Sequence, residues 1–147
     1  MPKVSDCMTR NVKIARPDQT VQEAARMMRD IDAGLLPVGD HDRLLGMITD
    51  RDIAVLAVAE GKGPQTHVRD VMTNDVKYVF DDEDIKDATR NMAEQQVRRL
   101  PVVNRDKRLV GIISLADVAN SKRGDGAAGR ALHGIAQPGG KHTQAQA

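Results

Sequence analysis

Apolar residues in the first half of the chain follow a helical period in one segment and form short runs on either side of it. The helical segment starts at Thr20, which with Glu23 predicts a capping box, and ends at Gly34. Apolar runs predict strands at residues 12–15, 35–38 and 44–49, and a second helix is expected from Asp50 to about Glu60. The apolar face of the first helix is predicted to comprise Val21, Ala24, Ala25, Met28 and Ile31.

The second half repeats this order nearly in register. Asp84 is expected to cap a helix whose buried face comprises Ile85, Ala88, Met92 and Ala93. Strands are expected at 100–103 and 109–114, and a last helix is expected from Leu115 to about Asn120. Tandem units of this kind usually share one pseudo-symmetric core, and the groove between them is a common ligand site. The recurring sequences include Met8-Thr9 as Met72-Thr73, Leu36-Pro37-Val38 as Leu100-Pro101-Val102, and Gly46 to Asp52 as Gly111 to Asp117.

Composition shifts divide the chain into four segments. Residues 1–60 form the first predicted domain and residues 68–121 the second, joined by a linker over residues 61–67 that contains Gly and Pro. Residues 122–147 have no apolar period, and we expect a disordered tail there.

Charge and aromatic content exclude several classes of partner. The net charge is +1, so no overall field attracts nucleic acid or a membrane surface. Tyr78 and Phe80 are the only aromatic residues, and we expect both to pack in the core, with stacking of Tyr78 on an adenine ring as the alternative.

The sequence has no run of apolar residues long enough to span a membrane, and it has no signal-peptide pattern. A cytoplasmic location is therefore expected.

Metal sites are not indicated by the spacing of potential ligands. Cys7 is the sole cysteine, and the four histidines share no spacing typical of metal ligands. The acidic run at residues 81–84 is interpreted as a solvated turn before a helix, with a divalent-ion site as the open alternative.

Each half carries a hydroxyl residue followed three positions later by an aspartate, where its last strand meets its last helix. The pairs are Thr49 with Asp52 and Ser114 with Asp117. A hydroxyl beside free helix amides suits a phosphate, and a carboxylate one turn later can accept hydrogen bonds from the 2′ and 3′ hydroxyls of a ribose. The same spacing is also how an ordinary helix caps itself, so the pattern alone does not distinguish ligand binding from capping.

The whole pattern resembles a tandem pair of cystathionine β-synthase (CBS) domains, also called a Bateman module. The resemblance covers residues 4 to about 120 and rests on the recurring sequences given above together with Asp6 and Asp70. It implies an α+β fold (an α/β sandwich) in which two β-α-β-β-α units pack sheet to sheet about a pseudo-two-fold axis. It also implies up to two clefts for an adenosyl ligand: AMP, ADP, ATP, NAD(H) or S-adenosylmethionine.

Site residues follow from the resemblance by position. Asp52 and Asp117 are expected to hold ribose hydroxyls, and Thr49 and Ser114 to reach phosphate or ribose. Arg98 and Arg99 fall where related modules place phosphate contacts, whereas the first half has Ala33-Gly34-Leu35 there, so unequal clefts are expected.

The resemblance also implies that the strand entrance of one half completes the cleft of the other. Residues near Val12 and Lys13 would serve the Asp117 site, and those near Val76 and Lys77 the Asp52 site. The remaining candidates for ligand binding are Arg51, which is equally well explained as a solvated side chain, and Leu36, Pro37, Leu100 and Pro101.

The expected function is regulatory nucleotide binding without catalysis. The sequence has neither a nucleophile–base pair nor a phosphate-binding Gly-x-x-x-x-Gly-Lys loop. We expect a homodimer that acts in trans on an effector protein, and the alternative is a stress-response scaffold whose clefts stay empty.

Overall fold

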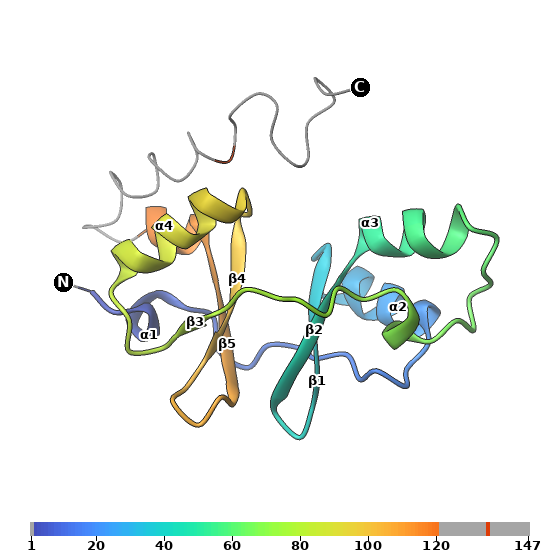
Figure 1. Ribbon diagram of the computed structural model, residues 1–147, viewed down its shortest axis with the longest axis horizontal. Helices are drawn as coiled ribbons and strands as arrows, with labels where there is room; N and C mark the ends of the chain where they lie inside the picture. The colour runs from blue at the N-terminus through green and yellow to red at the C-terminus, as the bar shows by residue number, and fades with distance from the viewer. Residues whose placement is uncertain (1, 121–134, 136–147) are drawn as a thin grey trace. The chain divides into compact units, whose positions relative to one another are not determined.

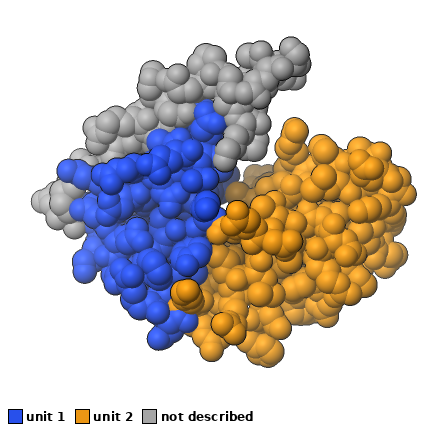
Figure 2. Space-filling view, in the orientation of Figure 1, with its two compact units in different colours: residues 1–12, 77–106, 110–147 blue, residues 13–76, 107–109 orange. Residues whose placement is uncertain are grey.

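The computed structural model describes residues 2–120 and residue 135, and forms an α+β fold with two small sheets (Figure 1). The predicted tail, residues 122–147, lies outside the described residues except for Ile135. The chain divides into two compact units (Figure 2). Unit 1 contains described residues 2–12, 77–106 and 110–120, and unit 2 contains residues 13–76 and 107–109.

Unit 2 contains a two-stranded sheet and one long helix. Strands β1 (Leu35–Asp40) and β2 (Arg43–Thr49) pair antiparallel through a tight turn. Helix α2 (Val21–Ile31) precedes them, and α3 (Asp50–Asp52) continues into the π-helix η1 (Ile53–Val58) after them. The 3₁₀ helix η2 (Val68–Asp70) follows the linker.

Unit 1 contains a three-stranded sheet in the order β3-β4-β5. Strand β3 (Val79–Phe80) pairs parallel with β4 (Arg99–Val103), which neighbours β5 (Leu109–Ser114). The helices of this unit are α1 (Val4–Cys7), α4 (Ile85–Gln95) and α5 (Leu115–Ala119).

Each unit buries its own aliphatic core. In unit 2 the core joins the inner face of α2 to both strands, and Leu36 and Ile48 are fully buried in it. In unit 1 it joins α4 to the sheet, with Ile85, Met92 and Ile113 buried to 1% exposure or less. The sequence pattern predicted these faces, except that Ala25 and Ile31 of α2 are exposed.

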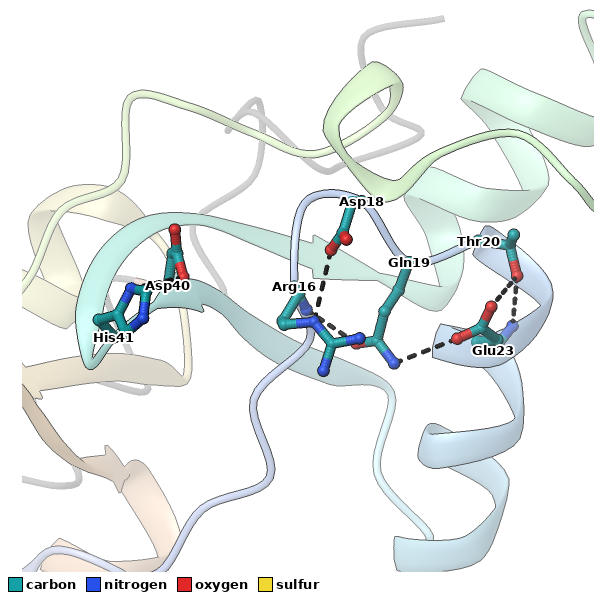
Figure 3. A network of polar contacts seen from close by, with 7 residues as sticks. All are labelled: Arg16, Asp18, Gln19, Thr20, Glu23, Asp40 and His41. Carbon is teal, nitrogen blue, oxygen red and sulfur yellow. Dashed lines mark hydrogen bonds and ion pairs between the residues drawn. The ribbon is translucent and has the colours of Figure 1, made fainter.

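The ends of α2 differ in detail from the prediction. Thr20 Oγ1 accepts a hydrogen bond from the Glu23 amide, as expected, but the Glu23 carboxylate meets the Thr20 hydroxyl and Gln19 instead of the Thr20 amide (Figure 3). The helix ends because Asp32, with φ 53° and ψ 49°, takes the left-handed conformation. Gly34 therefore does not end the helix. Instead, its lack of a side chain leaves room for the Asp50 carboxylate.

The linker contributes the remaining cap of α2. The amides of Val21 and Gln22 donate to the carbonyls of Thr66 and Pro64, at 2.8 and 3.2 Å. The first amides of a helix have no partner within the helix, so this docking satisfies two of them.

Two predicted elements are wrong in their geometry. The strand expected at residues 12–15 is reduced to a single parallel bridge between Ala15 and Val38, equivalent to the longer pairing of β3 with β4. The helix expected from Asp50 to Glu60 is mostly π-helical, and the Ala59 amide donates to the carbonyl of Ala54, five residues earlier.

The Met-Thr sequence of each half lies against the strand of the other half. Thr9 and Ile112 of unit 1 exchange two backbone hydrogen bonds of 2.8 and 3.0 Å, and Thr73 and Met47 of unit 2 do the same. The residues before Val12 thus belong to the compact unit of the second half, and η2 to that of the first. Relative to the sequence repeats, the units have exchanged these short segments.

Tyr78 is not a core residue, contrary to the prediction. It is 36% exposed and meets Phe80 edge to face, with ring centroids 5.6 Å apart. Phe80 is half-buried beneath the Arg105 guanidinium, whose central carbon lies 4.0 Å from the ring centroid.

Arg105 also holds Asp82 through three hydrogen bonds of 2.7 to 3.1 Å, which keep the pKa of that carboxyl below its usual range. Because the pKa of this carboxyl is depressed in the folded protein, the ion pair stabilises the folded state at pH values above the ordinary aspartate pKa. That contribution is lost as the pH falls through the pKa of Asp82 in the folded state.

We expect Arg105→Gln to raise the pKa of Asp82 toward that of a free aspartate. A carboxyl NMR titration of both proteins measures it, and an unchanged Asp82 midpoint would show that the ion pair does not persist in solution.

Candidate functional site

Both hydroxyl–aspartate pairs form the same reciprocal cap at the start of a helix. Thr49 Oγ1 accepts from the Asp52 amide at 3.0 Å, and Asp52 Oδ2 accepts from the Thr49 amide at 2.9 Å. In unit 1 the equivalent bonds join Ser114 and Asp117 at 3.1 and 2.9 Å. The capping interpretation left open by the sequence is therefore present in both motifs.

Capping occupies only one oxygen of each carboxylate. Asp52 and Asp117 are half-buried, and within residues 2–120 no hydrogen bond or ion pair engages Oδ1 of either side chain. The hydroxyls of Thr49 and Ser114 serve as acceptors in the cap, which leaves their own protons to donate. Each motif can thus offer one carboxylate acceptor and one hydroxyl donor to a ligand while the cap stays intact.

The residues beside the two motifs differ in charge. The Leu115 amide donates to the carbonyl of Arg98 at 2.8 Å, so Arg98 lies beside the Ser114–Asp117 motif. At the equivalent place in unit 2 the Asp50 amide donates to Gly34 at 2.9 Å. Arg98 and Arg99 are exposed, as is Arg51 beside the first motif. None of these three arginine side chains has a hydrogen bond or ion pair within the part of the chain that the structure describes.

The apolar candidates are buried in strands. Leu36 and Pro37 lie in β1, and Leu100 and Pro101 lie in β4. Leu36 pairs with Ile48, one residue before Thr49, so the strand is adjacent to the motif within unit 2. A ligand contact of these side chains stays a prediction.

The four candidates at the strand entrances lie outside the regular elements. Val12 and Val76 are half-buried, whereas Lys13 and Lys77 are exposed. The chain leaves unit 1 after Val12 and returns to it at Lys77. Val12 thus shares a unit with Asp117, and Val76 shares one with Asp52, whereas Lys13 lies in the unit of Asp52 and Lys77 in that of Asp117. The roles of all four in ligand binding stay predictions.

Sequence reasoning missed two features around the motifs. A Cβ on Gly111 would lie 2.6 Å from the Thr9 carbonyl oxygen, and one on Gly46 would lie 2.5 Å from that of Thr73. These glycines admit the exchanged Met-Thr segments, and their recurrence in the repeat was the available signal. The charge of Asp50 was the other feature, visible in the sequence as a position where the first copy has a carboxylate and the second has Leu115.

Three of the four acidic side chains at residues 81–84 are engaged by protein groups. Asp82 pairs with Arg105, Glu83 accepts from the Phe80 amide, and Asp84 caps α4 by accepting from the Lys86 amide at 2.9 Å. Among the described residues, no group of three or more His, Cys, Asp or Glu side chains is arranged to hold a metal ion.

A family model for the CBS domain matches the chain twice, over residues 4–58 and 68–124. This chain belongs to the CBS domain family. It is 41% identical over 135 residues to the CBS domain-containing protein YhcV of Bacillus subtilis, spanning 92% of this chain and 96% of that protein. It is 40% identical over 121 residues to Hypoxic response protein 1 of Mycobacterium tuberculosis, spanning 81% of this chain and 84% of that protein.

Two CBS structures similar to this chain contain adenosyl compounds. The structure of CBSX2 in complex with AMP has a TM-score of 0.72 and 31% identity, and covers 80% of this chain and 93% of that one. The CBS domain pair of MJ0100, in complex with 5′-methylthioadenosine and S-adenosylmethionine, has a TM-score of 0.72 and 28% identity, and covers 81% of this chain and 94% of that one.

Among the described residues, the structure has no helix with the length and apolar character that a membrane span requires.

Proposed function

We propose that this CBS pair is a regulatory module that binds an adenosyl ligand and catalyses no reaction of its own. The observation that carries the proposal is the unused Oδ1 of Asp52 and Asp117 in two equivalent, half-buried motifs. That oxygen is free to accept a ribose hydroxyl, while Oδ2 holds the carboxylate in place. The adenosyl compounds in the related CBSX2 and MJ0100 structures support the ligand class.

Regulation follows from differential affinity. A ligand that binds one arrangement of the module more tightly than another shifts the population toward it. We propose that this shift is sensed by a separate effector protein in the cytoplasm. AMP, ADP, ATP, NAD(H) and S-adenosylmethionine share the adenosyl group, so titration with each is needed to rank them.

Replacing each aspartate by asparagine separates ligand binding from capping. In Asp117→Asn the side-chain oxygen can still accept the Ser114 amide, but an NH₂ group then replaces the acceptor offered to the ribose. We expect AMP binding at this motif to weaken by about 1–3 kcal/mol, the scale of a hydrogen bond to a charged group, with little change in stability. Asp52→Asn should weaken adenosyl binding at the other motif in the same way, and isothermal titration calorimetry with AMP and with uncharged 5′-methylthioadenosine measures both motifs.

Asp6→Asn is the matched control. Asp6 Oδ2 accepts a bond of 2.9 Å from the Lys3 amide, which is the carboxylate half of such a cap at the start of α1, where no hydroxyl residue supplies the other half. This variant should bind AMP like the wild type. Wild-type affinity in both Asp52→Asn and Asp117→Asn would refute the ribose role of the motifs.

A second candidate function is an interaction scaffold that needs no ligand. It is favoured by the completeness of the two caps, since each motif is already satisfied within its own helix start. Absence of heat with AMP, ATP, NADH and S-adenosylmethionine, together with unchanged melting temperatures, would favour this candidate over a sensor.

We also propose that the chain forms a homodimer through the helical segment made of α3 and η1, residues 50–58. This helix carries no charge from Ile53 to Val58, yet Val55, Leu56 and Val58 are 41%, 43% and 68% exposed. Arg51 and Glu60, both exposed, stand at opposite ends of the apolar stretch. An antiparallel pair of such helices about a two-fold axis buries the apolar side chains and sets Arg51 of each copy against Glu60 of the other.

Leu56→Glu is expected to convert the dimer into a monomer, because a carboxylate would be buried in the apolar centre of the interface. Leu45→Glu is the matched control, since Leu45 is 42% exposed on β2 outside this helix. Light scattering after size-exclusion chromatography measures the mass of each. A monomeric wild type, or equal dissociation in both variants, would contradict this interface.

A further inference from the structure

The two motifs differ in formal charge at two neighbouring positions that a backbone hydrogen bond holds together in each unit. The residue that follows the hydroxyl residue is Asp50 in unit 2 and Leu115 in unit 1. The residue whose carbonyl accepts its amide is Gly34 in unit 2 and Arg98 in unit 1. Asp52 and Asp117 are equivalent, so these neighbours, together with Arg51 in unit 2 and Arg99 in unit 1, set the electrostatic difference between the two sites.

The Asp50 carboxylate is held against Gly34. A Cβ on Gly34 would lie 2.9 Å from Asp50 Oδ2, and Asp50 Oδ1 accepts a bond of 2.8 Å from the Arg51 amide. The carboxylate thus fills the space that a side chain at residue 34 would need. No cationic side chain among the described residues lies within ion-pair distance of it. The Thr49–Asp52 motif therefore carries two carboxylates with no paired cation, and the guanidinium of Arg51 beside it is exposed and unpaired within the described residues.

The same place in unit 1 carries the opposite charge. Leu115 is half-buried against the unit 1 core and contributes none, while Arg98 contributes an exposed guanidinium. Asp50 and Arg51 beside the first motif sum to 0, and Arg98 and Arg99 beside the second sum to +2, so the neighbours of the two motifs differ by two charges. A phosphate brought within about 5 Å of Asp50 or Arg98 meets repulsion in one motif and attraction in the other.

We propose that Asp50 determines ligand charge: the Ser114–Asp117 motif takes a nucleotide phosphate, whereas the Thr49–Asp52 motif rejects it and takes an uncharged or cationic adenosyl compound. This rests on the proposed function, because it concerns the ligand of the same two motifs. The proposal predicts that the module binds two different adenosyl compounds at the same time, one at each motif.

Asp50→Asn is the variant that tests the proposal, because asparagine keeps the size of the side chain and the acceptor for the Arg51 amide but removes the charge. Calorimetry uses AMP as the anionic probe and 5′-methylthioadenosine as the uncharged probe. In the wild type we expect one tight AMP site per chain, which Asp117→Asn weakens and Asp52→Asn does not. Asp50→Asn should raise AMP affinity at the other motif at least about 10-fold and leave 5′-methylthioadenosine affinity within about 3-fold.

The reverse exchange, Arg98→Gly combined with Leu115→Asp, should weaken AMP at the Ser114–Asp117 motif by a similar factor. Wild-type AMP binding to both motifs with equal affinity, or Asp50→Asn with no gain, would overturn the role of Asp50 and leave adenosyl binding standing. Failure of both probes to bind the wild type and Asp50→Asn would overturn the proposed function as well. The melting temperature of each variant shows that the protein titrated is folded.

Discussion

Gly46→Ala and Gly111→Ala should each destabilise the protein by about 2–4 kcal/mol, the upper range for overpacking of a tight site. The added Cβ would lie 2.5 Å from the Thr73 carbonyl oxygen in the first case and 2.6 Å from the Thr9 carbonyl oxygen in the second. Both obstacles are backbone atoms held by paired hydrogen bonds of 2.8 and 3.0 Å. The strand and the Met-Thr segment must separate to admit the methyl group, so those bonds weaken too.

Urea unfolding monitored by circular dichroism measures the loss, and Gly63→Ala is its control. A Cβ on Gly63 would have no atom within 4 Å, and its φ is not positive, so this variant should stay within about 0.5 kcal/mol of the wild type. Wild-type stability in Gly46→Ala and Gly111→Ala would mean that the Met-Thr segments do not pack on the strands.

Ile48→Ala and Ile113→Ala should each cost about 2–5 kcal/mol, the usual range for truncating a fully buried isoleucine. The two residues are equivalent in the repeat, each fully buried in the core of its own unit. Both the lost transfer energy and the cavity left behind contribute, because neighbouring strands and helices relax only in part. Similar losses are expected from the two variants.

Ile31→Ala is the matched control for this pair, since Ile31 is 39% exposed. It should cost less than about 1 kcal/mol in the same urea experiment, because much of its side chain stays in water. A loss at Ile48 or Ile113 no larger than that at Ile31 would show that the corresponding core is not packed as the structure has it.

Sequence patterns predicted the elements well where the local signal and the packing agree. The faces of α2 and α4 were predicted from Val21, Met28, Ile85 and Met92, which lie in the two cores. Asp84 was predicted as a cap because an aspartate before an apolar helical period satisfies free amides. Strand β5 was predicted at its observed bounds.

The errors arose where contacts distant in sequence decide the geometry. Asp32 in the left-handed conformation ended α2 before the predicted glycine, and Gly34 proved to be needed for the approach of Asp50. The exchange of Met8-Thr9 and Met72-Thr73 between halves had no signal in local periodicity, because backbone pairing across long separations leaves no spacing pattern.

The candidate motifs were predicted at the right residues, but their chemistry was open. Thr49 with Asp52 and Ser114 with Asp117 form the caps that their spacing permits. A hydroxyl three residues before an acid satisfies helix amides whether or not a ligand binds, so the sequence could not separate the two roles. The structure adds that one carboxylate oxygen of each pair is left unused by the cap.

An NMR titration of ¹⁵N-labelled protein with AMP tests adenosyl binding most directly, because the amides of Ser114 and Asp117 are themselves the donors of the cap. We predict saturable shifts at Ser114, Leu115 and Asp117 that are strongly reduced in Asp117→Asn. Shifts that are absent at these amides, or that saturate equally in Asp117→Asn, would contradict a ligand site at this motif.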